Sequence, residues 1–370
     1  MASIRKRSKD DGGGYQVRYY GPDGRLRSST FKTKREAVDF SNHVESDIAR
    51  GSWVDPALAA TPLRDFVDGY LRSSMHWRPS TRLKVEGHAR NYVVPAFGDY
   101  ALGDIRPSDI RNWIVALSDH GLAPGTVRAV YSSLSRILKQ ATIDGLIPRS
   151  PCLGISLPKD EVQREMLFLD PVGVQALAEE VPERYRVLIF TAAYTGLRWG
   201  ELAALKVRNL DLVKGTVRVT EAVAEVNGHL KEGPTKTGAT RTVALPPFLR
   251  KMLSEHLALY PSKGYVFTSA KGHPLRRNFY RRDFVPAVAR AKLPRGLRFH
   301  DLRHTCAALL IANGAHPKEI QERLGHSTIR VTFDRYGHLL PSLDERLRDG
   351  LETMYRAARG GMPPSTRARG

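Results

Sequence analysis

Two proline-bearing stretches constrain how this chain of 370 residues can fold. Residues 56–62 are mostly small, and residues 148–159 contain three prolines and one glycine. Proline interrupts helices and central strands, so we interpret both stretches as linkers. The chain is also too long for one ordinary hydrophobic core. We therefore predict three folded parts and a tail, over residues 1–55, 61–150, 160–350 and 351–370.

The first part has the pattern of a small sheet packed on one helix. Residues 15–20 and 25–31 are rich in strand-forming residues and are joined by a Gly-Pro-Asp-Gly turn. Thr33 and Glu36 have the spacing of a capping box, and Gly51 follows the last residue of the helical pattern. These signals predict a helix between Thr33 and Gly51.

The second part, residues 61–150, is typical of a domain of four or five helices. Apolar residues recur at helical spacing over residues 110–117 and 127–138. Ser80 and Ser108 are candidate N-caps, because a serine side chain can accept a hydrogen bond from the first turn of a helix. We expect few or no strands here.

The third part mixes helices with a small sheet. Asp170 before Pro171 predicts the start of a helix, and residues 184–194 predict a second, apolar one. Three segments have strand patterns, and Asn227 with Gly228 is a hairpin turn between the first two of them. The segments are residues 216–226, 229–233 and 240–245. The predicted fold class is thus a multidomain protein, mainly α with small β-sheets, whose third domain is α+β.

Net charge narrows the class of partner. The chain has 58 Lys and Arg against 38 Asp and Glu, a formal charge of +20, and 41% hydrophobic residues. A folded, strongly basic protein without a long apolar run favours nucleic acid over a membrane. Cys152 and Cys306 are the only cysteines, so we expect no disulfide framework and no multi-cysteine zinc site. The expected location is a reducing cytoplasm.

Basic residues gather in two stretches that are candidate DNA-binding surfaces. Residues 1–35 hold ten Lys or Arg against three acids, and residues 271–303 hold ten against two. A solvated basic face is the alternative for each stretch, and also for charged residues opposite the apolar stripe of the second domain. The residues we expect to contact DNA are Arg18, Arg25, Arg27, Arg128, Arg276 and Arg277.

Four motifs in the third part carry the residue types that phosphoryl transfer needs. Arg198 lies in Thr-Gly-Leu-Arg-Trp-Gly-Glu-Leu, His300 and Arg303 in His-Asp-Leu-Arg-His-Thr, His326 in Leu-Gly-His, and Tyr336 in Arg-Tyr-Gly-His. Arginine can clamp the non-bridging oxygens of a phosphodiester, histidine can move protons, and tyrosine can attack phosphorus. Each motif alone is weak, but their joint order predicts an active site.

In this order and spacing the motifs resemble those of the tyrosine recombinases, and specifically the phage integrases. The resemblance spans nearly the whole chain, because many integrases place a three-stranded arm-type DNA-binding domain and a helical core-binding domain before the catalytic domain. It implies that Tyr336 is the nucleophile, that Arg198 and Arg303 clamp the phosphate, and that His300 and His326 assist them. For Arg198 the alternative is a surface ion pair with Glu201.

The resemblance also implies a general acid. In the family a hairpin lysine protonates the leaving 5′ oxygen, and Lys236 within Thr-Lys-Thr-Gly-Ala-Thr-Arg is the candidate, with Lys231 nearby as a competitor. His304 and His338 lie beside the motif residues. We interpret these two as structural, since a lone histidine is more often structural than catalytic.

The implied reaction keeps the bond energy of DNA in a 3′-phosphotyrosine ester, so we expect no nucleotide cofactor and no metal. Consistent with this, the chain has no phosphate-binding loop of the Gly-x-x-x-x-Gly-Lys type. The implied partners are double-stranded DNA with core-type and arm-type sites, three further copies in a tetramer, a DNA-bending host factor and an excisionase. Two alternatives stay open: a type IB topoisomerase-like enzyme, and a catalytically silent DNA-binding accessory protein.

Overall fold

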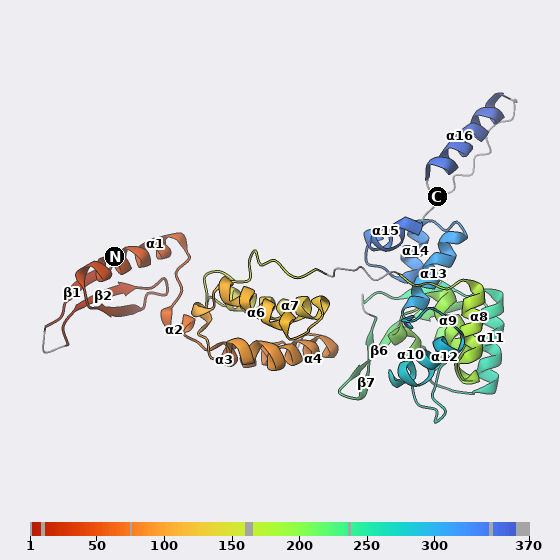
Figure 1. Cartoon of the computed structure of the whole chain (residues 1–370), viewed down its shortest axis with the longest axis horizontal. Coiled ribbons are helices and arrows are strands. Elements are labelled where there is room, and N and C mark those ends of the chain that lie inside the picture. Colours follow the sequence, from red (N-terminus) through yellow and green to blue (C-terminus); the bar gives the residue numbers. More distant parts are fainter. Residues whose placement is uncertain are drawn as a thin grey trace. The chain divides into compact units, whose positions relative to one another are not determined.

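A computed structural model describes residues 2–8, 12–74, 76–159, 166–235, 238–339 and 343–359 (Figure 1). The chain divides into two compact units, Met1–Gln163 and Arg164–Gly370. Helices dominate both units, and the strands form small antiparallel sheets, which confirms the predicted fold class. Among the described residues, no helix is long and apolar enough to cross a membrane.

The N-terminal domain is a three-stranded antiparallel sheet with one covering helix. The order is β1-β2-β3, built from β1 (Ser3–Lys6), β2 (Tyr15–Tyr20) and β3 (Leu26–Phe31), and α1 (Lys34–Arg50) lies along one face (Figure 1). Alternate residues of β2, Val17 and Tyr19, are buried with Ala37 and Val44 of α1, whereas Arg18 points to the open face. The predicted capping box at the start of α1 and the left-handed glycine at its end are both present.

The third strand of the sheet, implied by the family resemblance, is β1. It has no buried residue and no apolar alternation, so only its pairing with β2 makes it a strand. One feature of this region differs from the prediction. Residues 56–62 were expected to be a linker, but they contain the short helix α2 (Pro56–Ala59). Asp55 caps α2 by accepting a hydrogen bond from the backbone of Ala57 at 3.0 Å, and Pro56 occupies the first turn.

The helical domain follows, with its own core of buried apolar residues. Its elements are α3 (Leu63–Ser73), α4 (Pro79–His88), η1 (Ala89–Val93), α5 (Val94–Phe97), η2 (Leu102–Asp104), α6 (Pro107–Asp119) and α7 (Pro124–Ile143). The predicted N-caps Ser80 and Ser108 are wrong by two residues, because Pro79 and Pro107 take the first helical positions and Arg78 and Arg106 precede them. The apolar residues of α6 and α7 that repeat at helical spacing are buried, as expected.

A π-helical turn widens a continuous helix before a proline at two places. The turn η1 precedes Pro95 in α5, and η4 (Tyr280–Phe284) precedes Pro286 in α12 (Val285–Arg290). Proline lacks an N–H and its ring collides with the carbonyl four residues earlier in a regular α-helix. The wider turn relieves that collision, so each helix continues past its proline.

Residues 148–159, predicted to be a linker, pack for most of their length on the helical domain. Cys152 is buried in the core of that domain, and its carbonyl accepts a hydrogen bond from Tyr131 Oη at 2.6 Å. Further along, Arg128 of α7 donates to the carbonyl of Pro158 at 2.7 Å. The segment is therefore an extended strap on α7, held by side chains that face it.

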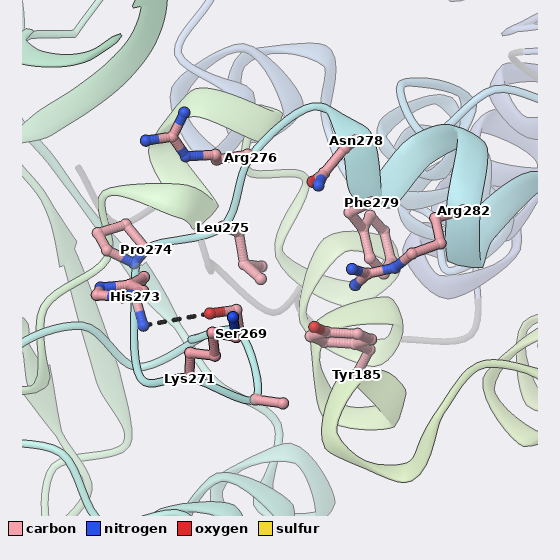
Figure 2. A pocket seen from close by; sticks show the side chains of 11 residues that line it. Tyr185, Ser269, Lys271, His273, Pro274, Leu275, Arg276, Asn278, Phe279 and Arg282 are labelled. Carbon is pink, nitrogen blue, oxygen red and sulfur yellow. Dashed lines mark hydrogen bonds between the residues drawn. The ribbon is translucent and has the colours of Figure 1, made fainter. Parts of the chain in front are cut away.

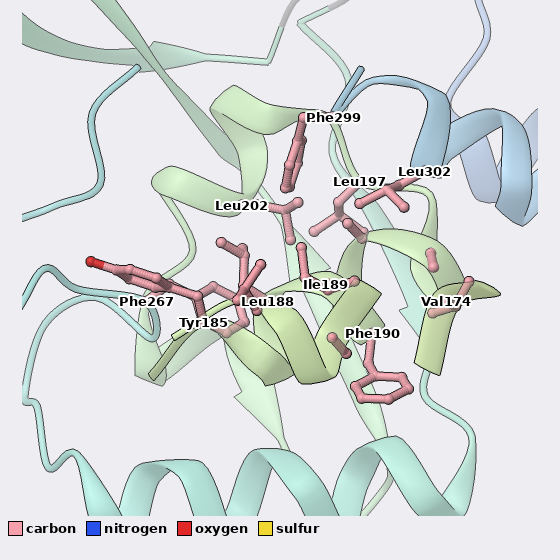
Figure 3. Close-up of a cluster of buried hydrophobic side chains, with 14 of the residues drawn as sticks. Val174, Tyr185, Leu188, Ile189, Phe190, Leu197, Leu202, Phe267, Phe299 and Leu302 are labelled. Atoms are coloured by element: carbon pink, nitrogen blue, oxygen red, sulfur yellow. The ribbon is translucent and has the colours of Figure 1, made fainter. Parts of the chain in front are cut away.

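The second unit contains the remaining elements, and buried residues between Leu169 and Leu302 form one large core (Figure 3). They are α8 (Pro171–Glu180), α9 (Glu183–Thr195), α10 (Trp199–Ala203), η3 (Val207–Asn209), β4 (Leu210–Asp211), β5 (Thr216–Val219), β6 (Glu221–Val226), β7 (His229–Pro234), β8 (Arg241–Ala244), α11 (Pro247–Leu259), α13 (Asp301–Ala312), α14 (Pro317–Leu324), α15 (Ile329–Tyr336), η5 (Gly337–Leu339) and α16 (Leu343–Arg359). Asp170 caps α8 as predicted. Helix α9 runs through the middle of the core, with Leu188 and Ile189 fully buried.

The predicted single sheet is in fact two. Strands β4, β5 and β8 form one sheet, and β6 pairs with β7 in a separate hairpin. The expected strand over residues 216–226 is broken at Thr220, whose hydroxyl accepts a hydrogen bond from Asn209 at 3.2 Å. The hairpin turn at Asn227 and Gly228 is confirmed, since both residues have positive φ, 50° and 73°.

Candidate active site

Arg198 lies where α9 turns into α10. Helix α9 ends at Gly196, whose left-handed φ of 68° reverses the chain so that Arg198 precedes the first turn of α10. The Arg198 guanidinium donates to Glu201 Oε1 at 2.8 Å and to the carbonyl of Gly325 at 3.1 Å. The ion pair with Glu201 is therefore present, but it differs from the surface pair we considered, because Glu201 is only 2% exposed.

Glu201 holds a second arginine as well. Arg241 of β8 donates to both carboxylate oxygens, at 3.1 and 2.7 Å, and its Nε donates to the carbonyl of Arg323 at 2.9 Å. Desolvation would raise the pKa of Glu201, but the hydrogen bonds and charge of Arg241, together with Arg198, lower it below its usual value. One buried carboxylate thus fixes two guanidinium groups and, through Arg241, the chain just before Gly325.

Arg303 completes this group from α13. It is 3% exposed and donates to the carbonyls of Gly196 and Leu324, each at 2.6 Å. Desolvation, and then the nearby charge of Arg198, lower the pKa of Arg303 to about 9. The side chain therefore stays protonated at neutral pH, but no carboxylate among the described residues bonds to it, so an anion placed beside it would be stabilised.

Tyr336 is the last residue of α15 and lies in a small core separate from the main one. It is 1% exposed and packs with Cys306, Ile320 and Leu324. Its hydroxyl is 2.8 Å from Nδ1 of His304, a residue of α13. Burial raises the pKa of Tyr336 to about 12, against the opposing effect of Arg303.

The other two predicted histidines surround this pair. The ring of His326 lies parallel to that of Tyr336, with centroids 6.3 Å apart and an interplanar angle of 12°, and His326 Nδ1 is 2.8 Å from Thr332 Oγ1. The ring of His300 meets that of His304 edge to face at 5.3 Å. Desolvation and neighbouring positive charge lower the pKa of His300 to about 4 and of His326 to about 3, so both are neutral at pH 7.

The structure thus brings five of the six predicted catalytic residues into one cluster. Lys236 lies outside the described residues, as does the side chain of His338. The sequence analysis missed two members, His304 and Arg241. For His304 the available signal was its position one helical turn after His300, which places both on one face of α13.

A second basic feature lies around the loop before η4. A cavity of about 300 Å³ opens there, and Lys271, Arg276 and Arg282 are among its lining residues (Figure 2). Arg276 donates to the carbonyl of Gly228 at 2.6 Å, which ties the cavity to the turn of the β6–β7 hairpin. The side chain of Arg277 is exposed.

The predicted DNA-binding arginines of the first unit differ in how far their side chains are already engaged by other residues. Arg18 and Arg25 are exposed on the sheet and the turn beside it. Arg27, in contrast, donates to Asp23 at 2.7 Å and to Asp55 at 3.0 Å, and its guanidinium lies 4.7 Å from the ring centroid of Trp53. Arg128 is engaged with the residue 148–159 strap, as described above. Arg27 and Arg128 are therefore weaker candidates for phosphate contacts than Arg18.

Comparison with known proteins places this architecture in a family. The profile of the Phage integrase family matches residues 156–342, and that of the Phage integrase, N-terminal SAM-like domain matches residues 63–118. The chain is 30% identical over 351 residues to a putative prophage phiRv2 integrase of Mycobacterium tuberculosis. This alignment covers 90% of this chain and 91% of the integrase. It is 26% identical over 364 residues to the integrase of Mycobacterium phage L5, covering 94% and 96%.

Solved structures share the fold. The Tn1549 transposon integrase, in complex with a circular intermediate DNA, aligns with a TM-score of 0.69 at 19% identity, over 79% of this chain and 99% of that one. A lambda integrase tetramer bound to a Holliday junction aligns with a TM-score of 0.58 at 20% identity, over 88% and 95%. Fold and site together define a DNA strand transferase built around a tyrosine.

The chain belongs to the phage integrase family and is a site-specific tyrosine recombinase. Membership of the family favours this class over the two alternatives left open by the sequence, a topoisomerase-like enzyme and a silent accessory protein. Within the described residues, no group of three His, Cys, Asp or Glu side chains is placed to hold a metal ion.

Proposed function

We propose that the cluster around Tyr336 cleaves one strand of double-stranded DNA and reseals it to a partner strand. The observation that carries this proposal is an imbalance of charge next to Tyr336, among the residues that the structure describes. Arg198 and Arg241 share the buried carboxylate of Glu201, whereas Arg303, whose charge acts on Tyr336, donates to backbone carbonyls. A phosphodiester supplies the missing negative charge, and its pentacoordinate transition state supplies more.

The steps follow from this arrangement. Tyr336 Oη bonds to phosphorus, the bond from phosphorus to the 5′ oxygen breaks, and a 3′-phosphotyrosine ester remains. Arg198 and Arg303 stabilise the charge that develops on the non-bridging oxygens, while His300 and His326, both neutral at pH 7, can hydrogen-bond the phosphate. Lys236 is the family's candidate to protonate the 5′ oxygen. The 5′-hydroxyl of a partner strand then attacks the ester and reseals DNA.

The front of the chain would choose the sites. We assign residues 1–55 to arm-type DNA and residues 61–150 to core-type DNA, with the open face of the β1–β3 sheet, which carries Arg18, against the arm site. The DNA complexes of the Tn1549 and lambda integrases support DNA as the partner, and the lambda tetramer supports a tetramer of this chain on paired sites. A DNA-bending host factor, an excisionase and a location on the DNA of a bacterial host complete the proposal.

The test is trapping of the covalent intermediate. A nicked duplex is made from the junction between the encoding element and its host chromosome, so that the short strand released by cleavage diffuses away and resealing is prevented. Wild-type chain should form a covalent adduct between Tyr336 and a 3′ phosphate of the duplex. A chelator is present throughout, so that the reaction is tested without divalent metal ions. Tyr336→Phe should bind the duplex and form no adduct.

Tyr100→Phe is the matched control, because Tyr100 is an exposed residue of the helical domain whose ring packs on Phe97. This variant also loses one tyrosine hydroxyl, but at a position far in sequence from the residues of the site. It should therefore form adduct at the wild-type rate. An adduct that persists in Tyr336→Phe, or that maps to another residue, would contradict the proposed chemistry.

A further inference from the structure

Tyr336 has one close polar neighbour in the described part of the site, and that neighbour is His304. The hydroxyl and Nδ1 are 2.8 Å apart, within the range of a strong hydrogen bond. Both side chains are almost completely buried, at 1% and 6% exposure. Water therefore has little access to the phenol, so its proton must leave to a protein group.

The other histidines are poorly placed to take that proton. The ring centroid of His326 lies 6.3 Å from that of Tyr336, and His326 Nδ1 is 2.8 Å from Thr332 Oγ1. In the part of the site that the structure describes, no hydrogen bond joins His326 to the phenol. His300 packs against the edge or face of His304, one turn away on α13.

We propose that His304 is a further catalytic residue, the proton acceptor for Tyr336, an inference that rests on the strand cleavage proposed above. As Tyr336 Oη bonds to phosphorus, its proton passes to His304 Nδ1. The bond from phosphorus to the 5′ oxygen breaks, and that oxygen keeps the electron pair and takes a proton from the general acid of the proposed cleavage. When a 5′-hydroxyl reseals the strand, it gives its proton to that acid's conjugate base as it bonds to phosphorus, and Oη leaves phosphorus and takes its proton back from His304.

The charges around His304 explain why the proton moves only with DNA present. Desolvation, and then the positive charges of Arg335, Arg298 and Arg303, lower the pKa of His304 to about 4 against the opposing effect of Asp301, while that of Tyr336 is about 12. The proton therefore stays on the phenol in the free protein. A bound phosphate neutralises part of the arginine charge, which makes His304 a stronger base.

Several groups besides the arginines influence the pKa of His304, so the pH dependence of cleavage reflects all of them. On α13 and the loop before it, and on the elements packed against them, the titratable and charged neighbours of His304 are Arg298, His300, Asp301, Arg303, His326, Arg335 and Tyr336. Of these, the two histidines have lowered pKa values, about 4 for His300 and about 3 for His326, so both are neutral in the free protein at the pH of a cleavage assay.

The test is single-turnover cleavage of the nicked duplex by His304→Asn, which keeps a hydrogen-bond acceptor but cannot take a proton at neutral pH. Cleavage should fall by about 10²–10⁴-fold, the usual contribution of a general base. The rate should also keep rising with pH toward the pKa of Tyr336, since only the preformed phenolate now reacts. His316→Asn is the matched control, because exposed His316 caps α14 and asparagine can cap a helix as well, so this variant should keep the wild-type rate and profile.

Two further measurements separate proton transfer from structural support. A strand ending in a 3′-(p-nitrophenyl) phosphate can be ligated without Tyr336, so His304→Asn should ligate it near the wild-type rate, whereas Arg303→Met should not. Fluorotyrosine at position 336, a more acidic phenol, should speed His304→Asn more than the wild type. His304→Gln repeats each assay if the Asn variant does not fold.

The outcomes distinguish the two proposals. If wild-type chain forms no adduct at Tyr336, the proposed strand cleavage fails and the role of His304 fails with it. If wild-type chain forms the adduct but His304→Asn cleaves at the wild-type rate, or cleaves slowly with an unchanged pH profile and no gain from fluorotyrosine, then His304 is a structural residue and only this inference is overturned.

Discussion

Two arginine clusters in this chain have opposite charge balance. In the N-terminal domain, one guanidinium, that of Arg27, lies between the carboxylates of Asp23 and Asp55. In the catalytic unit, the guanidinium groups of Arg198 and Arg241 share Glu201, and Arg303 lies nearby with only carbonyl partners. The first cluster already contains its counter-charges, whereas the second lacks them. An arginine is informative about anion binding only when its carboxylate partners are counted too.

Burial sharpens this contrast. The side chain of Arg27 is 18% exposed and those of its two partners more so, which makes their pairing a partly solvated one of modest value. The side chain of Glu201 is 1% exposed, in a setting where unpaired charge is costly. In the catalytic cluster, the burial of uncompensated positive charge costs free energy, and a bound phosphate lowers that cost. In the N-terminal cluster the guanidinium of Arg27 already has carboxylate partners, so there is no such cost for a phosphate to lower.

The largest effect is expected from removing the arginine with no carboxylate. Arg303→Met should lower single-turnover cleavage about a thousandfold, because a preorganised donor to the transition state is lost. Arg303→Lys should fall between the two, since it keeps a charge without the donor fork. Arg27→Met is the control from the balanced cluster and should leave the cleavage step itself unchanged at saturating protein. Comparable losses in the two Met variants would remove the distinction between the clusters.

The next effect is on stability. Glu201→Gln removes the one carboxylate between Arg198 and Arg241, and breaking a buried ion pair in this way costs about 3–5 kcal/mol. Urea unfolding of the catalytic unit, followed by the fluorescence of Trp199, should show that loss. Glu180→Gln breaks an exposed pair with Arg290 in the same unit and should change the midpoint little. Equal midpoints for the two variants would show that Glu201 is not the anchor we describe.

The same carboxylate predicts a pH dependence. Because the folded-state pKa of Glu201 lies below the ordinary value for glutamate, its contribution to stability is complete above that ordinary value and is lost as the pH falls through the lower, folded pKa. The urea midpoint of wild-type chain should therefore decline in acid more steeply than that of Glu201→Gln. Parallel declines would mean that other carboxylates account for the acid sensitivity.

Local signals in the sequence were sufficient for much of the fold. Gly51, the Asp170–Pro171 pair and the Asn227–Gly228 turn were placed correctly, because each rests on the conformational preference of one or two residues. The third strand was implied by the family resemblance, but its position was not found from the residues, because β1 is stabilised by pairing with β2 and has no apolar pattern. The break at Thr220 was missed because no glycine or proline marks the point where the chain changes sheets.

For the site, the sequence indicated which residue types assemble but not which atoms meet. Tyr336 and His304 lie 32 positions apart, and their contact depends on how α13 and α15 pack. The engagement of Arg27 with Asp55, 28 positions away, is of the same kind. Tertiary contacts between distant polar residues leave no periodic pattern, so the roles of His304 and Arg27 had to come from the structure.

A fourth prediction concerns the glycine that shapes the site. At Gly196, φ is 68° and an added Cβ would collide with Leu324 Cδ2 and lie 3.2 Å from Cys306 Sγ. Gly314, in the same unit, has a φ of 74° with open space around it. Gly196→Ala and Gly314→Ala share the backbone strain, but only Gly196→Ala also overpacks its surroundings. Urea unfolding should therefore show Gly196→Ala to be less stable than Gly314→Ala by about 1–3 kcal/mol, the usual cost of overpacking. Equal losses would show that Leu324 can move aside freely.

The smallest effect is on DNA affinity, and it applies the same contrast to the predicted DNA-binding arginines. Each phosphate that an arginine neutralises contributes about 0.9 to the slope of log K against log salt. Arg277 is exposed beside the basic cavity, so Arg277→Ala should lower that slope by about one unit. Arg27 already has its counter-charges, so Arg27→Ala should leave the slope unchanged even if it weakens binding through the fold of its domain. Arg276, bonded to the carbonyl of Gly228, should fall between them. A slope that drops equally for Arg277 and Arg27 would mean that DNA displaces Asp23 and Asp55 from Arg27, and that the N-terminal cluster opens when DNA binds.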